Sequence, residues 1–79
     1  MIKAYVLVVT TPGSTRGVVE AIRGIAGVVE LHEVMGPYDV VVEIEVQSLS
    51  EVPAILSDKI RSVPGIESTT SLVTFPENG

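Results

Sequence analysis

The feature that most constrains the fold is an internal repeat with a spacing of 38 residues, the separation of Gly27 and Gly65. A solenoid needs at least about three repeats to bury a continuous core, so two copies cannot form one. Two strand-helix-strand units can instead interleave into one sheet with both helices on the same face. The strand positions that this shift superposes are Val40, Ile44 and Val46 on Ile2, Val6 and Val8.

The first copy is predicted to form a strand, a helix and a second strand. Residues 2–10 are rich in β-branched side chains and stop at a Pro-Gly break, which is typical of a strand. Ser14 or Thr15 can cap the helix, and Gly27 predicts its C-terminal cap. Residues 28–35 then form the second strand. The helix has an apolar stripe at helical spacing, made of Val18, Val19, Ile22 and Ile25.

The second copy follows Gly36-Pro37, which predicts a tight turn and a hairpin into a third strand over residues 38–46. Ser48 with Glu51 fits an S-x-x-E capping box for the second helix, but it places Pro53 at the fifth helical position, so Ser50 is the better cap. With that cap, Pro53 falls in the first turn, where its missing amide hydrogen is harmless. The buried stripe of this helix is predicted to contain Leu49, Val52, Ile55, Leu56, Ile60 and Val63.

With residues 66–75 as the fourth strand, the element order is βαββαβ, which predicts an α+β, ferredoxin-like fold. Right-handed crossovers give a four-stranded antiparallel sheet of strand order 4-1-3-2, with the two helices on one face. We expect residues 1–76 to form this single domain and residues 77–79 to form a tail. The second and fourth strands are then edges, which suits their polar side chains.

The composition excludes several classes of protein. The 79 residues are 46% hydrophobic, yet no run approaches the roughly 18 apolar residues of a membrane span. The net charge of −5, with scattered basic residues, disfavours direct nucleic-acid binding, which needs a basic stripe. The lack of cysteine excludes disulfides, thiolate metal sites and cysteine nucleophiles. No signal peptide is recognisable, so we expect a cytoplasmic protein.

A second apolar face is predicted on the sheet, opposite the helices. A contiguous exposed apolar patch on a soluble protein usually marks an interface. We therefore expect the chain to form at least a dimer through this face. The alternative is an ordinary, half-solvated antiparallel sheet. The predicted interface residues are Tyr5, Leu7, Val9, Leu31, Met35, Val41, Val73 and Phe75.

The ionisable residues do not form a recognisable catalytic set. His32 is the single histidine, strand alternation sends it and Glu33 to opposite faces, and two ligands do not make a tetrahedral metal site. Asp39, Glu43 and Glu45 follow one another at even spacing and could bind a hard cation or act as an acid–base set, although solvation or pairing with Lys3 and other bases is the favoured interpretation for Glu43 and Glu45. We expect no catalytic residue, no metal and no cofactor.

Two segments favour binding of a small zwitterion, which needs an acceptor for its ammonium group and N–H or O–H donors for its carboxylate. The first supplies a flexible backbone, an aromatic hydroxyl and a carboxylate in Gly36, Tyr38 and Asp39. The second supplies three hydroxyls on an edge strand, from Thr69, Thr70 and Ser71. Taken alone, each segment is also explained as turn chemistry or as a polar edge strand.

Several motifs resemble the effector-sensing domain of the Lrp/AsnC transcriptional regulators, also called the regulation-of-amino-acid-metabolism (RAM) domain. They are V-L-V-V-T in the first strand, G-x-Y-D followed by V-V-V-E-I-E-V, and P-G-I-x-S-T-T-S-L-V near the end. The resemblance covers nearly all of residues 1–75, and the G-x-Y-D turn and the threonine-rich segment are its most specific parts.

This resemblance implies a non-enzymatic regulatory domain that dimerises through its sheets, assembles dimers into rings and binds amino acids between dimers. It also implies that Gly36, Tyr38 and Asp39, with the three hydroxyl residues of the last strand, line the ligand site. Because the first strand begins at Ile2, we expect a stand-alone sensing domain without a helix-turn-helix. Such a domain could modulate transcription by co-assembly with full-length regulators.

The runner-up hypothesis is a small dimeric α+β barrel enzyme, such as a cofactor-free monooxygenase or isomerase. Such an enzyme has the same topology but needs a cavity between sheet and helices lined by His, Asn, Trp or Tyr. The chain offers one histidine and no tryptophan, which weighs against this hypothesis. A purely structural assembly module with an empty site is a third possibility.

Overall fold

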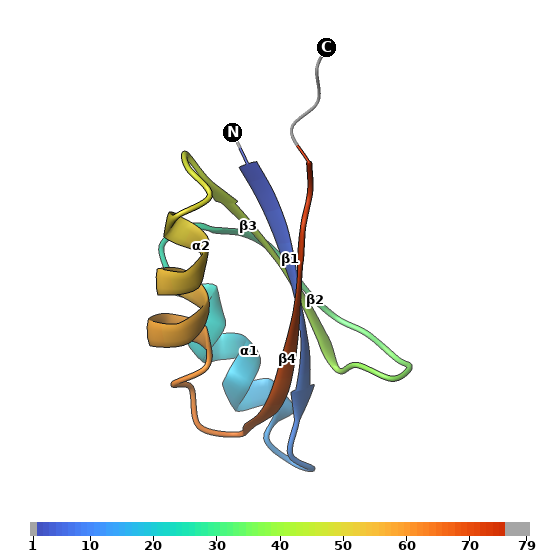
Figure 1. Ribbon diagram of the computed structural model, residues 1–79. Helices are drawn as coiled ribbons and strands as arrows, with labels where there is room; N and C mark the ends of the chain where they lie inside the picture. Colours follow the sequence, from blue (N-terminus) through green and yellow to red (C-terminus); the bar gives the residue numbers. More distant parts are fainter. Residues whose placement is uncertain (1, 76–79) are drawn as a thin grey trace.

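The secondary structure of the computed structural model follows the predicted order, βαββαβ (Figure 1). The structure describes residues 2–75, with the exception of the Ser57 side chain; Met1, Pro76 and the predicted tail at residues 77–79 lie outside the described residues. The second helix has two parts, a short α-helical turn and a π-helical continuation. The elements are β1 (Ile2–Thr10), α1 (Thr15–Arg23), β2 (Val28–Glu33), β3 (Val40–Val46), α2 (Glu51–Ala54), η1 (Ile55–Ile60) and β4 (Ile66–Val73).

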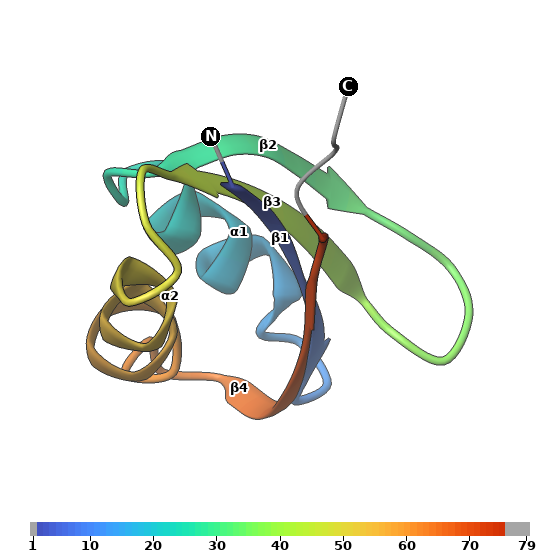
Figure 2. The ribbon, with the colours of Figure 1, turned by 45° about the horizontal axis from the view of Figure 1, so that its top comes forward.

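The four strands form one antiparallel sheet in the order β2-β3-β1-β4, which confirms the predicted order 4-1-3-2. Helix α1 and the continuous α2–η1 helix lie on the same face of this sheet (Figures 1 and 2). Val6 lies at the middle of β1, paired with Val42 on β3 and with Ser71 on β4. The sheet therefore has one face that the helices cover and one outer face that is open in the single chain.

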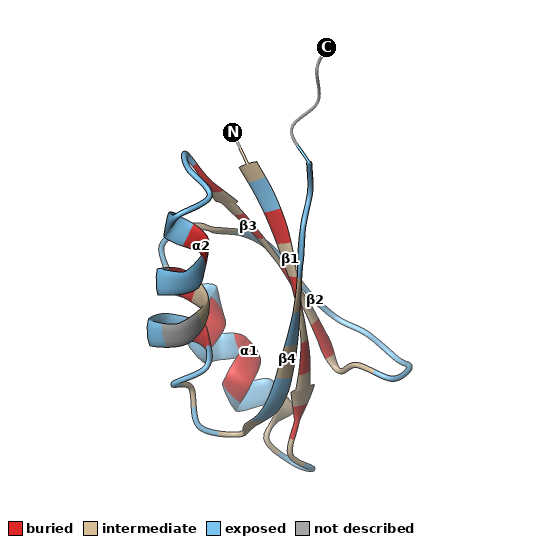
Figure 3. Ribbon diagram, in the orientation of Figure 1, coloured by how far each residue is buried: buried red, intermediate tan, exposed pale blue. Residues whose placement is uncertain are grey.

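The hydrophobic core lies between the sheet and the helices (Figure 3). Alternate residues of β1 and β3 turn inward, as predicted, and pack against the inner sides of α1 and η1. Burial of one such aliphatic side chain contributes about 1.5–3 kcal/mol to folding. The largest fully buried side chains are Val6, Val8, Val18, Ile22, Val40, Val42, Ile44 and Ile60.

Each edge strand carries one extra residue, and the two extra residues occupy equivalent positions of the repeat. They are Val29 in β2 and Glu67 in β4, separated by the same 38 residues as Gly27 and Gly65. A bulge of this kind places two residues opposite one and reverses the facing of every later side chain in the strand. The flanking pairs are Val28–Ile44 and Glu30–Glu43 in β2, and Ile66–Thr10 and Ser68–Val9 in β4.

The bulges overturn two predictions about the outer face. Leu31 pairs with the inward-facing Val42 and packs against the core, so its predicted outward position is wrong. Val73 pairs with the inward-facing Ala4, so it also lies on the helix side of the sheet. Its neighbour Leu72 pairs with Tyr5 and faces outward. Leu72 is absent from the predicted interface residues, because uninterrupted alternation along the strand assigns it to the helix side.

The connection between β2 and β3 differs from the predicted tight turn at Gly36-Pro37. Strand β2 ends at Glu33 and β3 begins at Val40, so residues 34–39 form a longer loop. This loop extends beyond the end of the sheet (Figure 2). The predicted hairpin is confirmed. The predicted strands at residues 28–35 and 38–46 are too long on either side of the loop, because the first ends at Glu33 and the second begins at Val40.

The predicted helix boundaries also change. Helix α1 ends at Arg23 with Gly24 as its cap, and Gly27 lies in the following turn with φ +98°. Ser50 occupies the N-cap position of α2, as predicted, but its side chain makes no capping hydrogen bond. Leu49 lies before this cap and is 57% exposed, so its place in the buried stripe was wrong.

A carboxylate closes the turn before α2. The Oε2 atom of Glu51 accepts hydrogen bonds from the amides of Ser48 at 2.8 Å and Gln47 at 3.0 Å. This is the return half of a capping box, in which an acidic side chain in the first turn satisfies amides that precede the helix. Within residues 2–75, no helix has the length and apolar character that a membrane crossing requires.

Candidate ligand-binding site

The loop of residues 34–39 holds the first group of predicted ligand residues, and two backbone hydrogen bonds fix its two ends to the sheet and to each other. The Asp39 amide donates to the Val8 carbonyl at 2.8 Å, and the Val34 amide donates to the Asp39 carbonyl at 3.0 Å. Gly36 has φ +135°, in the region that glycine reaches readily. The structure thus brings Gly36, Tyr38 and Asp39 together on one short loop that is fixed at its base.

The Asp39 carboxylate is oriented by the end of β1. Its Oδ2 atom accepts a hydrogen bond from the Thr10 amide at 2.8 Å and another from the Thr10 hydroxyl at 3.2 Å. A carboxylate has two oxygens that each accept more than one hydrogen bond, so these contacts leave acceptor capacity. Asp39 therefore ties the loop to β1 and still has capacity to accept a hydrogen bond from a ligand.

Sequence reasoning did not single out Thr10 as part of this site. It is 6% exposed, and it is the buried polar residue in the described part of the chain. Its position was visible in the alternation of β1, in which Ala4, Val6 and Val8 precede it as inward-facing residues. A polar residue at the next inward position must find a hydrogen-bond partner, and this was the available signal.

The second group of predicted ligand residues lies on β4 and faces in two directions. Thr69 and Ser71 pair with inward-facing residues of β1, whereas Thr70 pairs with the outward-facing Leu7. The Ser71 hydroxyl is buried and has no hydrogen-bond partner among the described residues. The three hydroxyls therefore do not converge on one point of a single chain.

The two groups lie at the same end of the sheet but are separated by β1. Val8 of β1 pairs with Val40, the residue after the loop, and on its other side with Thr69. Adjacent strands are about 4.8 Å apart, so the backbones of β3 and β4 are about 10 Å apart here. One chain therefore places the loop and the β4 hydroxyls near one another without enclosing a common pocket.

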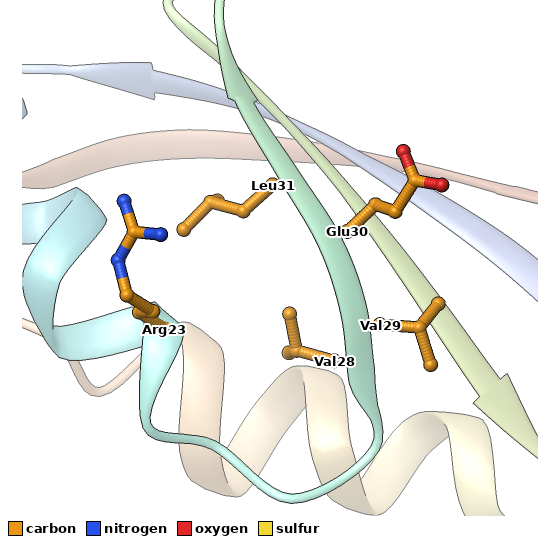
Figure 4. A pocket seen from close by; sticks show the side chains of 5 residues that line it. All are labelled: Arg23, Val28, Val29, Glu30 and Leu31. Carbon is orange, nitrogen blue, oxygen red and sulfur yellow. The ribbon is translucent and has the colours of Figure 1, made fainter.

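Away from these two segments, hollows lined by described residues lie beside the β2 bulge and beside the α2–η1 helix. One, of about 200 Å³, lies beside the β2 bulge, where Arg23 reaches along the helix side of the strand towards Leu31 while Val29 and Glu30 point away (Figure 4). The other, of about 310 Å³, lies between the turn at Gly27 and the α2–η1 helix. Neither is lined by a predicted ligand residue. Ligand pockets usually measure about 300–1,000 Å³, so the first is small for a ligand.

The outer face of the sheet combines an apolar centre with charged margins. We define it by the outward-facing apolar side chains Tyr5, Leu7, Val9, Val41 and Leu72. At its margins the Lys3 ammonium lies 3.6 Å from the Glu43 carboxylate, and His32 lies 2.9 Å from Glu30. The predicted pairing of Glu43 with Lys3 is thereby confirmed.

Two further predicted interface residues lie outside the strands. Met35, in the loop, is 98% exposed, and Phe75, after β4, is 93% exposed. Both are large apolar side chains in full contact with solvent in the single chain.

Comparisons with known proteins agree with this architecture. The family model of the Lrp/AsnC ligand binding domain matches residues 3–77. An uncharacterised HTH-type transcriptional regulator of Pyrococcus horikoshii is 33% identical over 75 residues, which cover 91% of this chain and 50% of that protein. The chain thus spans about half the length of the curated relatives it matches.

Solved structures share the fold over the whole chain. A crystal structure of a protein from Thermus thermophilus superposes with a TM-score of 0.93 at 30% identity and covers 100% of this chain and 99% of that one. A transcriptional regulator of Neisseria meningitidis, solved as a complex with L-Met, has a TM-score of 0.84 at 15% identity and covers 99% of this chain and 52% of that one. With the family match over residues 3–77, these findings show that the chain belongs to the Lrp/AsnC ligand-binding domain family.

Proposed function

We propose that this chain is a non-enzymatic regulatory domain that binds an amino acid between copies of itself. The observation that carries the proposal is the loop of residues 34–39, which presents Gly36, Tyr38 and Asp39 at the end of the sheet in a chain of this family. The L-Met complex of the Neisseria meningitidis regulator, which shares the fold, supports an amino acid as the class of ligand.

The chemistry of the loop suits the ammonium end of an amino acid. The Asp39 carboxylate is partly buried and held in place, so a charge-assisted hydrogen bond to an ammonium group would require little reorganisation. The half-buried Tyr38 adds a phenolic hydroxyl and an aromatic surface beside it. The carboxylate end needs donors, and of the three hydroxyl residues on β4 Thr70 is exposed on the outer side, whereas Thr69 and the buried Ser71 hydroxyl face the helix side.

We propose that two copies complete each site. The loop and the β4 hydroxyls of one chain lie on strands about 10 Å apart with β1 between them, and the hydroxyls face in two directions, so one chain does not gather these groups around one small amino acid. A site that combines the loop of one copy with β4 of another removes this difficulty. It also accounts for the exposure of Met35 on the loop, because a second copy would cover that side chain.

Assembly is proposed to begin with the outer face of the sheet. Its apolar side chains are only partly buried in the single chain, and a second copy would remove them from water. The same face would allow co-assembly with full-length regulators that carry this domain, and through them an effect on transcription. A barrel-type enzyme is disfavoured, because aliphatic side chains such as Val6, Ile22 and Ile44 fill the space that its cavity would need.

A thermal-shift screen of the twenty amino acids tests ligand binding. A ligand present at about 100 times its Kd adds roughly 2.7 kcal/mol to the free energy of unfolding, which raises the melting temperature measurably. A shift that is lost in Tyr38→Ala and kept in Tyr5→Phe would support the loop as the binding element. No shift with any amino acid would contradict the proposed ligand class.

A mixing experiment tests whether the site is shared. Tyr38→Ala disables the loop, and the double variant Thr69→Val/Thr70→Val disables the strand, so neither protein alone should bind. If the site combines two copies, co-refolding the two variants in equal amounts restores binding in about one quarter of the sites. If each site lies within one chain, the mixture stays inactive, which would refute the shared site without affecting the ligand class.

A further inference from the structure

The buried hydroxyl of Thr10 lies at the centre of a hydrogen-bond chain that joins three elements. It donates to Asp39 Oδ2 at 3.2 Å and lies 2.7 Å from the Thr15 hydroxyl. Because a hydroxyl has one hydrogen, and that hydrogen points to Asp39, the Thr15 hydroxyl must be the donor to Thr10. The chain therefore runs from the first residue of α1, through the end of β1, to the carboxylate of the ligand loop.

Each link strengthens the next. A hydroxyl that accepts a hydrogen bond becomes a better donor, and a bond to a carboxylate is stronger than one between neutral groups. The Thr10 amide adds a second bond, of 2.8 Å, to the same Oδ2 atom. Two donors from one residue therefore hold one oxygen of the Asp39 carboxylate.

The backbone around Asp39 is held as firmly as its side chain. Its amide donates to the Val8 carbonyl, and its carbonyl accepts from the Val34 amide, so both sides of the residue are anchored. The hydrogen bonds found within residues 2–75 all reach the carboxylate at Oδ2. Oδ1 therefore keeps its acceptor capacity among the described residues.

We propose that Thr10 is a positioning residue of the ligand site, which holds Asp39 so that Oδ1 is presented to the ammonium group of a bound amino acid. The inference rests on the proposed function, and it adds a residue outside the loop to the determinants of specificity. Thr10 does not touch the ligand. It selects ligands with an α-amino group by fixing the group that recognises them.

The test compares Thr10→Val with Thr10→Ser, and uses Thr11→Val as the matched control. Valine keeps the shape of threonine and removes the hydroxyl, whereas serine keeps the hydroxyl. The Thr11 hydroxyl donates a hydrogen bond to the Ser14 hydroxyl at 2.7 Å. Among the described residues, Thr11 makes no hydrogen bond to Asp39. The ligand is the L-amino acid that gives the largest thermal shift with the wild-type chain. The comparison compound is the same carboxylic acid with hydrogen in place of the α-amino group.

We expect Thr10→Val to weaken binding of the amino acid up to about tenfold, because a carboxylate that the hydroxyl no longer holds must be ordered when the ligand binds. Binding of the acid without the amino group should stay within about twofold, so the preference for the amino group falls. Thr10→Ser and Thr11→Val should bind both compounds within about twofold of wild type. General structural damage would lower the affinity for both compounds by a similar factor, and that result would overturn the positioning role.

The orientation of Asp39 can be measured without any ligand. Coupling constants from NMR should show one dominant χ1 rotamer of Asp39 in the wild type and in Thr10→Ser, and a larger population of a second rotamer in Thr10→Val, in which only the backbone amide of residue 10 still holds Oδ2. A single unchanged rotamer in Thr10→Val would refute the proposal. Equal amino-acid affinity of Thr10→Val and wild type would also refute it. If the wild type itself binds no amino acid, the proposed function fails, and the role of Thr10 in binding fails with it.

Discussion

A Cβ atom on Gly65 would lie 2.8 Å from the Cβ of Ser14 and 3.1 Å from Cγ2 of Val18. The Thr11 amide donates to the Gly65 carbonyl at 2.8 Å and holds the two turns together. Gly27, its equivalent in the repeat, has the same φ of +98° and approaches Ile55 of the other copy's helix. Each glycine of the repeat thus packs its turn against the helix of the other copy, which is how the two copies interlock.

Gly65→Ala should therefore destabilise the fold more than Gly13→Ala. Both residues have positive φ, +98° and +84°, so both alanines carry the backbone cost of about 1–2 kcal/mol. At Gly13 no atom lies within 4 Å of a new Cβ, whereas at Gly65 the Cβ meets Ser14. Urea unfolding should show a loss of about 2–4 kcal/mol for Gly65→Ala and about 1–2 kcal/mol for Gly13→Ala. Equal losses would mean that the close approach is absent in solution.

A second prediction separates the true stripe of the second helix from the predicted one. Ile60 is fully buried and Leu49 is 57% exposed, although the sequence pattern assigned both to the core. Ile60→Ala should lower the free energy of unfolding by about 2–5 kcal/mol, because it leaves a cavity. Leu49→Ala should change it by less than about 0.5 kcal/mol in a single chain. Chemical denaturation of both variants checks the difference, and a large cost at Leu49 would place that side chain in an interface.

The capping role of Glu51 leads to a third prediction. Its carboxylate accepts two backbone amides before α2, so Glu51→Ala should cost about 0.5–2 kcal/mol. Glu20→Ala, on the exposed side of α1, is the control and should cost less than about 0.5 kcal/mol. Amide hydrogen exchange at Gln47 and Ser48 should accelerate only in Glu51→Ala. Unchanged exchange would show that other groups hold this turn.

The repeat predicted the element order and the sheet, because periodic apolar residues report directly on burial. It did not predict the facing of β2 and β4 beyond the bulges. Nothing in the composition of Val29 or Glu67 marks an inserted residue, and the insertion becomes visible only when the strand is aligned with its neighbour. Equivalent bulges in the two copies also leave the repeat itself undisturbed, so a comparison of the copies cannot reveal them.

The candidate site was predictable in part for a similar reason. Gly36, Tyr38 and Asp39 are adjacent in sequence, so their proximity on one loop follows from the chain itself. The contact of Asp39 with Thr10 spans 29 residues and depends on the pairing of β1 with β3, which local patterns do not contain. The separation of the loop from β4 likewise follows from strand order and not from composition.

The last prediction uses the reversed facing of β4 to test assembly through the outer face. Leu72 and Val73 are neighbours on the same edge strand, with exposures of 52% and 41%, but Leu72 lies on the outer face and Val73 on the helix side. Leu72→Asp and Val73→Asp introduce the same residue at adjacent exposed positions of one edge strand, on opposite faces of the sheet, and so form a matched pair.

If two copies pack through their outer faces, Leu72→Asp places an unpaired charge in that interface, on a face that already carries Glu43 and Glu45. We expect the dimer dissociation constant of Leu72→Asp to rise by about tenfold to a thousandfold, because burying an uncompensated charge costs several kcal/mol. Val73→Asp should leave the constant within about twofold. Sedimentation equilibrium over a range of protein concentrations measures both constants. A stronger effect from Val73→Asp, or a wild-type chain that stays monomeric, would exclude the outer face as the primary interface.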